Sequence, residues 1–186
     1  FRGRLRGFVE RTFDREAYEF RESLMDFARG LPHILDRRTM AASLEETLTK
    51  AMGARWHYLF VLDRRARKLR LQPGKSPLSG GAMSVEFDLS EPLCQYLLGK
   101  ERPFEVEVSP YSPELIPVFR SAADRLGTLQ AAVIMGLKRR HELLGLLVMG
   151  NKTSRDFYDA EDLELLRTVA REAAAAVENI GLFEDL

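Results

Sequence analysis

Side chains that could serve as nucleophiles or metal ligands are few and scattered in this chain of 186 residues. Cys94 is the only cysteine, which excludes an internal disulfide and any zinc site built from several cysteines. His33, His57 and His141 fall in a predicted helix junction, a strand and a turn, so they form no clustered set of haem or metal ligands. Motifs for phosphate-binding loops, serine hydrolases and zinc proteases are also missing. The sequence therefore predicts no catalytic residue and no metal site, and it names no cofactor.

The overall charge gives little reason to expect a polyanionic partner. Lys and Arg together equal Asp and Glu, 28 of each, which argues against nucleic-acid binding. No apolar run reaches the ~20 residues needed to cross a bilayer, and the N-terminus lacks the apolar region of a signal peptide. Together with the single cysteine, this leads us to expect a cytoplasmic protein in a reducing compartment. Arginines at positions 2, 4, 6 and 11 fit a segment just inside a membrane, or equally an ordinary basic helix end. The start on Phe1 and the end within a helix suggest a piece of a longer protein. If the basic segment lies just inside a membrane, we expect that longer protein to be attached to the membrane before Phe1.

The first element predicted along the chain is a helix over residues 1–31. Its apolar positions are spaced alternately four and three apart: Phe13, Ala17, Phe20, Leu24, Phe27 and Leu31. This narrow seam between charged flanks favours a signalling helix that forms a dimer; the alternative is a helix packed on its own domain. Gly30 and Pro32 interrupt the helix, so residues 32–186 are predicted to form a separate domain.

A sheet is expected in this domain, because the apolar period changes to that of strands. Strands are predicted at 56–63, 68–72, 83–88 and 104–108, followed by a hairpin of apolar runs at 129–137 and 143–149. The segment 72–82, rich in Gly, Pro and Ser, is the clearest loop. Ser90 and Ser112 are predicted N-caps of the intervening helices.

A long helix follows the hairpin, with a stripe formed by Val169, Ala173, Ala176 and Ile180. Leu163, Ala170 and Val177 make this stripe wider than one seam, so we expect the helix to be buried on two sides. The prediction is a homodimer through the N- and C-terminal helices.

Two stretches carry a family resemblance: HELLGLLVMGNK (141–152) and FYDAEDLELLRTVAREAAAAVENI (157–180). Between about Asp36 and Leu182 the chain resembles a GAF domain, the small-molecule sensory module of bacterial signalling proteins. The resemblance implies a PAS-related α+β fold: a mainly antiparallel sheet of about six strands with helices on one face. A ligand chamber on the other face would be closed by short helices and loops. The N-terminal arm resembles the linker that joins membrane segments to GAF domains in sensor histidine kinases.

The resemblance also suggests where a ligand could lie. Its cyclic-nucleotide-binding members carry an N-K…F-x-x-x-D-E motif, which this chain matches with Glu-Asp for the two acids: Asn151, Lys152, Phe157, Glu161 and Asp162. We interpret this motif as structural, with Phe157 packing the loop on the core and the acids starting the helix. The expected chamber walls are Cys94, Leu97, Leu98, Phe119 and Ala122. Cys94 lacks the surrounding signatures of bilin attachment, and a free methionine sulfoxide reductase needs several cysteines.

These features predict a non-catalytic sensory GAF domain. It would bind a small molecule or mediate dimerisation, and pass a signal to an output module after Leu186, such as a histidine kinase of a two-component system. Two alternatives stay open. The first is a pure dimerisation scaffold whose chamber is filled by its own side chains. The second is a GAF domain that regulates a cyclase, phosphodiesterase, phosphatase or transcription factor.

Overall fold

The computed structural model describes residues 19, 21–73 and 84–184, apart from the side chains of Thr47 and Phe183. The predicted seam residues Phe13, Ala17 and Phe20 and most of the predicted loop 72–82 lie outside this part. A helix over 21–30 comes first, followed by these elements in chain order: η1 (Leu31–His33), α2 (Arg37–Met52), β1 (His57–Asp63), β2 (Lys68–Leu71), β3 (Glu86–Asp88), α3 (Pro92–Gly99), β4 (Phe104–Glu105), η3 (Ser109–Tyr111), α4 (Ile116–Leu129), β5 (Val133–Arg139), β6 (Glu142–Met149) and α5 (Ala160–Glu184).

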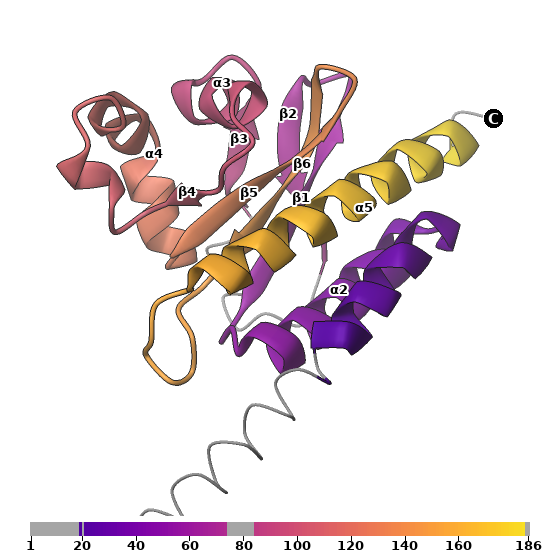
Figure 1. The fold of residues 1–186 in the computed structure, drawn as a ribbon. Coiled ribbons are helices and arrows are strands. Elements are labelled where there is room, and N and C mark those ends of the chain that lie inside the picture. Colours follow the sequence, from indigo (N-terminus) through magenta and orange to yellow (C-terminus); the bar gives the residue numbers. More distant parts are fainter. Residues whose placement is uncertain (1–18, 20, 74–83, 185–186) are drawn as a thin grey trace, which may run out of the picture.

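Six antiparallel strands form one sheet in the order β3-β2-β1-β6-β5-β4, which confirms the predicted fold (Figure 1). The two central strands, β1 and β6, are far apart in the chain and pair from His57–Met149 to Val61–Gly145. Every residue of β6 from Leu143 to Met149 is buried. A strand that is apolar on both faces requires cover on both sides of the sheet.

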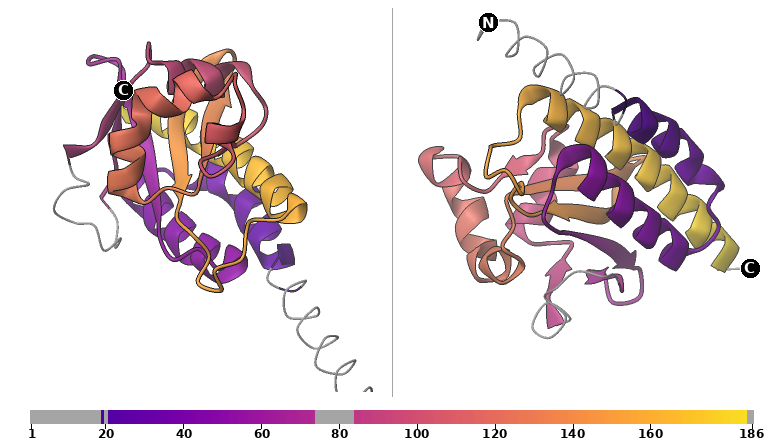
Figure 2. Two further views of the ribbon diagram at one scale, coloured as in Figure 1. Left: turned by 90° about the vertical axis from the view of Figure 1, so that its left-hand side faces the viewer. Right: turned by 90° about the horizontal axis from the view of Figure 1, so that it is seen from below.

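The two faces of the sheet are covered by different helices (Figures 1 and 2). The helix 21–30, α2 and α5 lie on one face, and α3 and α4 lie on the other. Phe60 of β1 contacts Phe87 of β3 edge to face, with ring centroids 5.1 Å apart. The Arg125 guanidinium of α4 lies 4.8 Å above the Phe87 ring, so these rings belong to the α3–α4 face. Because side chains alternate along a strand, His57, Leu59 and Val61 belong to the α2–α5 face.

The ends of α2 carry typical local signals, whereas the predicted caps of α3 and α4 do not coincide with the helix starts. Asp36 caps α2, since its Oδ1 accepts the Thr39 amide at 2.8 Å, and Gly53 ends the helix with φ of 67°. The predicted caps Ser90 and Ser112 are wrong, because α3 and α4 begin two and four residues later, at Pro92 and Ile116. Ser90 instead donates its hydroxyl to Asp88 at 2.6 Å, which closes the turn before α3.

The two terminal helices bury their apolar stripes within a single chain. Leu24 and Leu31 of the predicted seam are fully buried, and Phe27 is half-buried. On α5 the four stripe residues are all fully buried: Val169, Ala173, Ala176 and Ile180. Asn179 donates its side-chain amide to the Pro32 carbonyl at 3.2 Å, which holds η1 on α5. Packing within one chain accounts for both stripes, so the homodimer stays a prediction.

None of the helices within the described ranges is long and apolar enough to cross a membrane.

Candidate functional site

The predicted motif between β6 and α5 forms a polar corner that holds the two elements together. Asp162 is only 2% exposed, and its carboxylate accepts both the Lys152 ammonium and the Asp159 amide, the latter at 3.1 Å. In return, Asp159 accepts the Asp162 amide at 2.8 Å, and this hydrogen bond lowers the pKa of the Asp159 carboxyl. Arg21 pairs with Glu161 and lies 3.6 Å from Asp162, which ties the N-terminal helix to this corner.

The predicted role of Phe157 is wrong. Its side chain is 78% exposed, and the neighbouring Tyr158 occupies the buried place instead. Tyr158 donates its hydroxyl to the Gly150 carbonyl at 2.6 Å, and burial raises the pKa of this phenol. Asn151 is exposed and Lys152 lies 5.3 Å from the centre of the Tyr158 ring. The charged groups Lys152, Asp159, Glu161 and Asp162 all make contacts within this corner, which supports the interpretation of the motif as structural.

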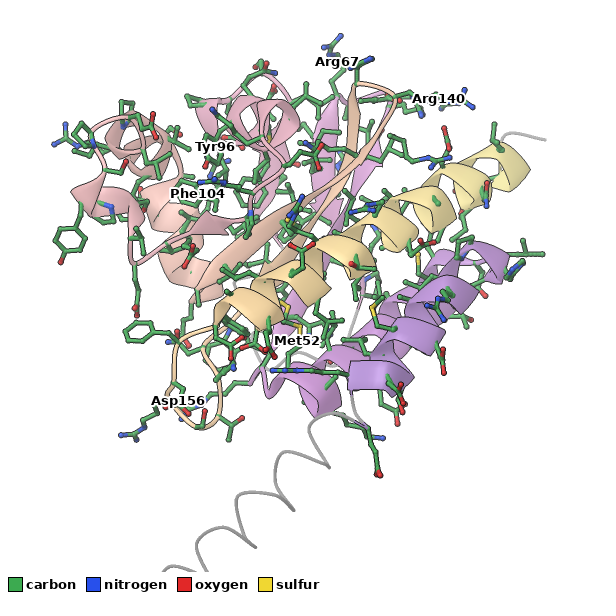
Figure 3. All side chains as sticks on the ribbon, in the orientation of Figure 1. Met52, Arg67, Tyr96, Phe104, Arg140 and Asp156 are labelled. Carbon is green, nitrogen blue, oxygen red and sulfur yellow. The ribbon has the colours of Figure 1, made fainter. Side chains whose placement is uncertain are left out.

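The predicted chamber residues lie together between α3, α4 and the sheet, but they do not enclose one common space. Cys94, Leu97 and Ala122 are buried, whereas Leu98 and Phe119 are half-buried. Leu97 packs directly over Gly136 of β5, where an added Cβ would lie 3.3 Å from the Leu97 Cβ. The space beneath α3 is further filled by the edge-to-face contact of Tyr96 with Phe104 (Figure 3). Among these five residues, only Cys94 and Leu98 line the pocket described next.

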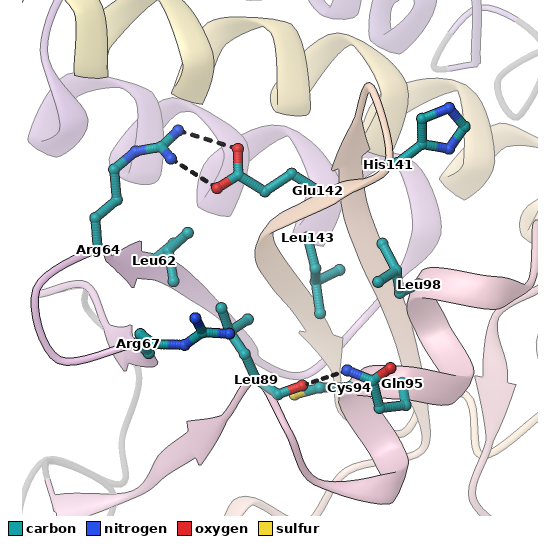
Figure 4. Close-up of a pocket in the computed structure, with 10 residues that line it drawn as sticks. All are labelled: Leu62, Arg64, Arg67, Leu89, Cys94, Gln95, Leu98, His141, Glu142 and Leu143. Atoms are coloured by element: carbon teal, nitrogen blue, oxygen red, sulfur yellow. Dashed lines mark hydrogen bonds and ion pairs between the residues drawn. The ribbon is translucent and has the colours of Figure 1, made fainter.

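A pocket of about 290 Å³ opens at the end of the sheet, beside α3 (Figure 4). Four leucines and Cys94 contribute its apolar surface, and the polar groups come from two turns and from α3. The lining residues are Leu62, Arg64, Arg67, Leu89, Cys94, Gln95, Leu98, His141, Glu142 and Leu143. Eight of these were not predicted. Most of them sit in or beside the β1–β2 and β5–β6 turns, which are distant in sequence and meet only because β1 pairs with β6.

The pocket lies beyond the point where the central strands β1 and β6 stop pairing with each other. The pairing of β1 with β6 ends at Val61 and Gly145, before the tips of the two hairpins. Beyond that point the tips are joined by a bidentate ion pair, in which Arg64 donates to both carboxylate oxygens of Glu142 at 2.6 and 3.2 Å. Arg67 and Arg140 mark the two neighbouring tips in Figure 3.

Backbone contacts fix the floor of the pocket. Arg67 has a positive φ of 55°, and its carbonyl accepts the Leu89 amide at 3.2 Å. The Leu89 carbonyl in turn accepts the Gln95 side-chain amide at 2.7 Å. These bonds hold the β1–β2 turn, the segment before α3, and α3 itself in one arrangement.

Cys94 lies in this pocket as a neutral thiol. Its side chain is 1% exposed, and burial, reinforced by the nearby Glu91 carboxylate, raises its pKa far above the ordinary value. A thiol held in this protonation state is a poor nucleophile. Across the described ranges, no group of three or more His, Cys, Asp or Glu side chains is placed to hold a metal ion.

A second pocket, of about 340 Å³, lies on the opposite face along α5. Leu144, Val177 and Gly181 are among its walls. It shares Leu62 and Arg64 with the pocket beside α3, so these two residues reach both faces of the sheet at the point where the strands part.

Comparison with known families decides the assignment, since residues 38–179 match the family model described as GAF domain. The chain belongs to the GAF domain family. No curated protein sequence matches this chain. Sensory and regulatory roles are the rule for GAF domains, and a few structures of this fold are enzymes.

Solved structures agree with the GAF fold at low sequence identity. A methyl-accepting chemotaxis protein (residues 122 to 287) is 16% identical, with a TM-score of 0.64 over 86% of this chain and 99% of that one. The phycoerythrobilin-bound GAF domain of a cyanobacterial phytochrome is 14% identical, with a TM-score of 0.62 over 90% and 99%. Free methionine-R-sulfoxide reductase from Neisseria meningitidis, in complex with its substrate, is 17% identical, with a TM-score of 0.60 over 90% and 93%. At these identities the likeness is one of fold.

Proposed function

We propose that this GAF domain is a non-catalytic sensory module in which a small molecule in the pocket beside α3 changes the packing of the terminal helices. The observation that carries the proposal is the shared position of Leu62 and Arg64, which line pockets on both faces of the sheet. An occupant on the α3 face touches the same residues that border α5. Only one layer of strands separates the two.

A physical route for the signal runs through the hairpin tips. Arg64 and Glu142 hold the tips together, and Arg139, on the same β5–β6 hairpin, donates its Nε to Glu178 of α5 at 2.9 Å. Movement of the hairpin tip therefore acts directly on the last turns of α5. A ligand drives such a movement only if it binds the two arrangements with different affinity.

The output module is the finer part of the proposal. We propose that α5 continues into a histidine kinase of a two-component system; a cyclase, phosphodiesterase, phosphatase or transcription factor would receive the same movement. The protonated state of Cys94 supports a domain without thiol chemistry of its own. The setting we propose is cytoplasmic.

Native mass spectrometry of freshly purified protein tests the sensory proposal first. We expect a co-purified small molecule, whose removal changes hydrogen exchange in residues 178–184 by at least severalfold. Exchange in α4, which does not line the pocket, serves as the internal control. A bound molecule whose removal leaves the end of α5 unchanged would contradict the proposed coupling.

A second candidate is a dimerisation scaffold, favoured by the dense packing beneath α3 around Leu97 and Gly136. In this case we propose that the predicted seam residues Phe13, Ala17 and Phe20 supply the contact between chains. Light scattering should compare the whole chain with a version that lacks residues 1–20, which removes all three of these seam residues. This deletion keeps Leu24, Ala28 and Leu31, which are fully buried in the domain. A dimer that becomes a monomer supports the seam, and a monomer in both cases defeats it.

A further inference from the structure

We infer that the pocket beside α3 holds a small organic anion with an apolar body, and that Arg67 binds its negative group. This inference rests on the proposed sensory function and adds the chemical class of the ligand. It is argued from the charge, the size and the lining of the pocket.

The two arginines that line the pocket are not equivalent. Arg64 is already satisfied, because both of its terminal nitrogens donate to Glu142. Among the described residues, no side-chain hydrogen bond or ion pair engages the Arg67 guanidinium. The charge of Arg67 contributes to the lowered pKa of Asp88, but hydrogen bonds from Ser90 lower that pKa the most and Arg67 the least. Arg67 is therefore the cation that is left for a ligand.

The position of Arg67 suits this role. Figure 4 shows its side chain lying over Leu89 and toward the middle of the lining residues, whereas the His141 ring points away from them. The left-handed backbone at Arg67 and the bond from the Leu89 amide to its carbonyl fix where this side chain begins. A guanidinium at the edge of an apolar surface binds carboxylate or phosphate oxygens through charge-assisted hydrogen bonds.

The floor and the volume define the rest of the ligand. Leu62, Leu89, Leu98 and Leu143 supply apolar contact opposite the charged edge. A volume of about 290 Å³ is at the lower end of ligand pockets and corresponds to roughly ten water molecules. A carboxylate or phosphate that carries a short alkyl chain or a single ring fits this space. Two arginines and one glutamate, Glu142, line the pocket, so its positive charge disfavours a cationic ligand.

Four probes with one alkyl chain separate the contributions of charge and apolar contact: hexanoate, hexyl phosphate, 1-hexanol and hexylamine. Titrations are followed by methyl signals of the lining leucines at fixed ionic strength, because salt screens exposed charges. We expect at least one anion to bind about tenfold or more tightly than hexanol, and hexylamine to bind weakest. The better of hexanoate and hexyl phosphate shows whether carboxylate or phosphate is preferred.

Variants of Arg67 locate the effect. Arg67→Gln should weaken anion binding about tenfold or more while leaving hexanol unchanged, and Arg67→Lys should restore most of the affinity. Arg55→Gln is the matched control, since Arg55 is an exposed arginine that precedes β1 at the opposite end of the strand. Anions that bind no tighter than hexanol, or that bind Arg67→Gln as well as the unaltered chain, overturn the inference.

The outcomes also separate this inference from the proposed function. If hexanol alone binds in the pocket and alters hydrogen exchange at the end of α5, the proposed sensory function is supported and the inference of an anionic ligand is rejected. If an anion binds through Arg67 without altering hydrogen exchange in α5, the anion site is supported and the proposed coupling between the pocket and α5 is rejected.

Discussion

His57 makes stability depend on pH in a way that can be calculated. It lies on β1, is 5% exposed, and neither ring nitrogen has a hydrogen-bond partner among the described residues. Burial lowers its pKa from 6.5 to about 4. The unfolded chain therefore binds a proton between pH 6.5 and 4 that the folded chain rejects. Above pH 6.5 this difference in proton binding costs no stability, and between pH 6.5 and 4 the free energy of unfolding falls as the pH falls.

The magnitude follows from the two pKa values. Between pH 7.5 and pH 5.0, His57 alone should lower the free energy of unfolding by about 2 kcal/mol, with a limit of roughly 3 kcal/mol at lower pH. Urea unfolding of the unaltered chain and of His57→Leu at both pH values measures this difference. The leucine variant should lose about 2 kcal/mol less on acidification. At pH 7.5 it should be at least as stable, because it no longer buries a polar ring without partners.

Leu59→Val is the control, since it alters packing on the same face of β1 without removing a titrating group. It should lose about 1 kcal/mol equally at both pH values. Equal pH dependence in the unaltered chain and His57→Leu would refute the reasoning, because it would mean that His57 is solvated or paired in the folded state.

Three further predictions concern packing and charge. Gly145→Ala should lower the free energy of unfolding by several kcal/mol, because its Cβ would lie 2.4 Å from the Phe60 carbonyl oxygen. The control is Gly127→Ala on α4, whose Cβ meets nothing within 4 Å, and it should be neutral or stabilising by about 0.5 kcal/mol. Thermal unfolding of both variants measures the difference. Asp162→Ala should cost about 2–3 kcal/mol by leaving Lys152 without its buried partner, whereas the exposed Glu161→Ala should cost under about 0.5 kcal/mol; equal losses in urea unfolding would mean that the corner is not an electrostatic joint. Iodoacetamide should label Cys94 at least a hundredfold more slowly in the folded chain than in urea at pH 8, because the folded thiol is buried and its pKa is raised; rapid labelling of the folded protein would contradict this placement.

The sequence was a good guide where a structural signal is local. Asp36 and Gly53 are residue types that favour helix ends, and both end α2 because a cap depends only on residues within one turn. The prediction that Phe157 packs on the core is wrong because the adjacent aromatic residue, Tyr158, is the one buried there. The choice of Tyr158 depends on a hydroxyl that can reach the Gly150 carbonyl, a contact that no periodicity reveals.

The pocket was harder to predict for a related reason. Cys94 and Leu98 were proposed because they lie on a helix of the expected chamber, and both line the pocket. Arg64 and Glu142 were missed because they are 78 positions apart and meet only after the central strands have paired. Their residue types are typical of exposed turns, so composition alone gave no reason to join them.

The pairing of β1 with β6 also limits how the chain can fold during synthesis. The partners His57 and Met149 are separated by most of the domain, and β6 must be complete before the centre of the sheet exists. Until then β1 has an open edge, and its apolar residues are available for wrong contacts. We therefore expect slow folding, with the central strand pair and α5 forming late and together, as is usual for sheets closed by distant contacts. A ribosome-bound chain that ends before residue 149 should be sensitive to protease across β1, and this sensitivity should disappear once residue 184 has emerged.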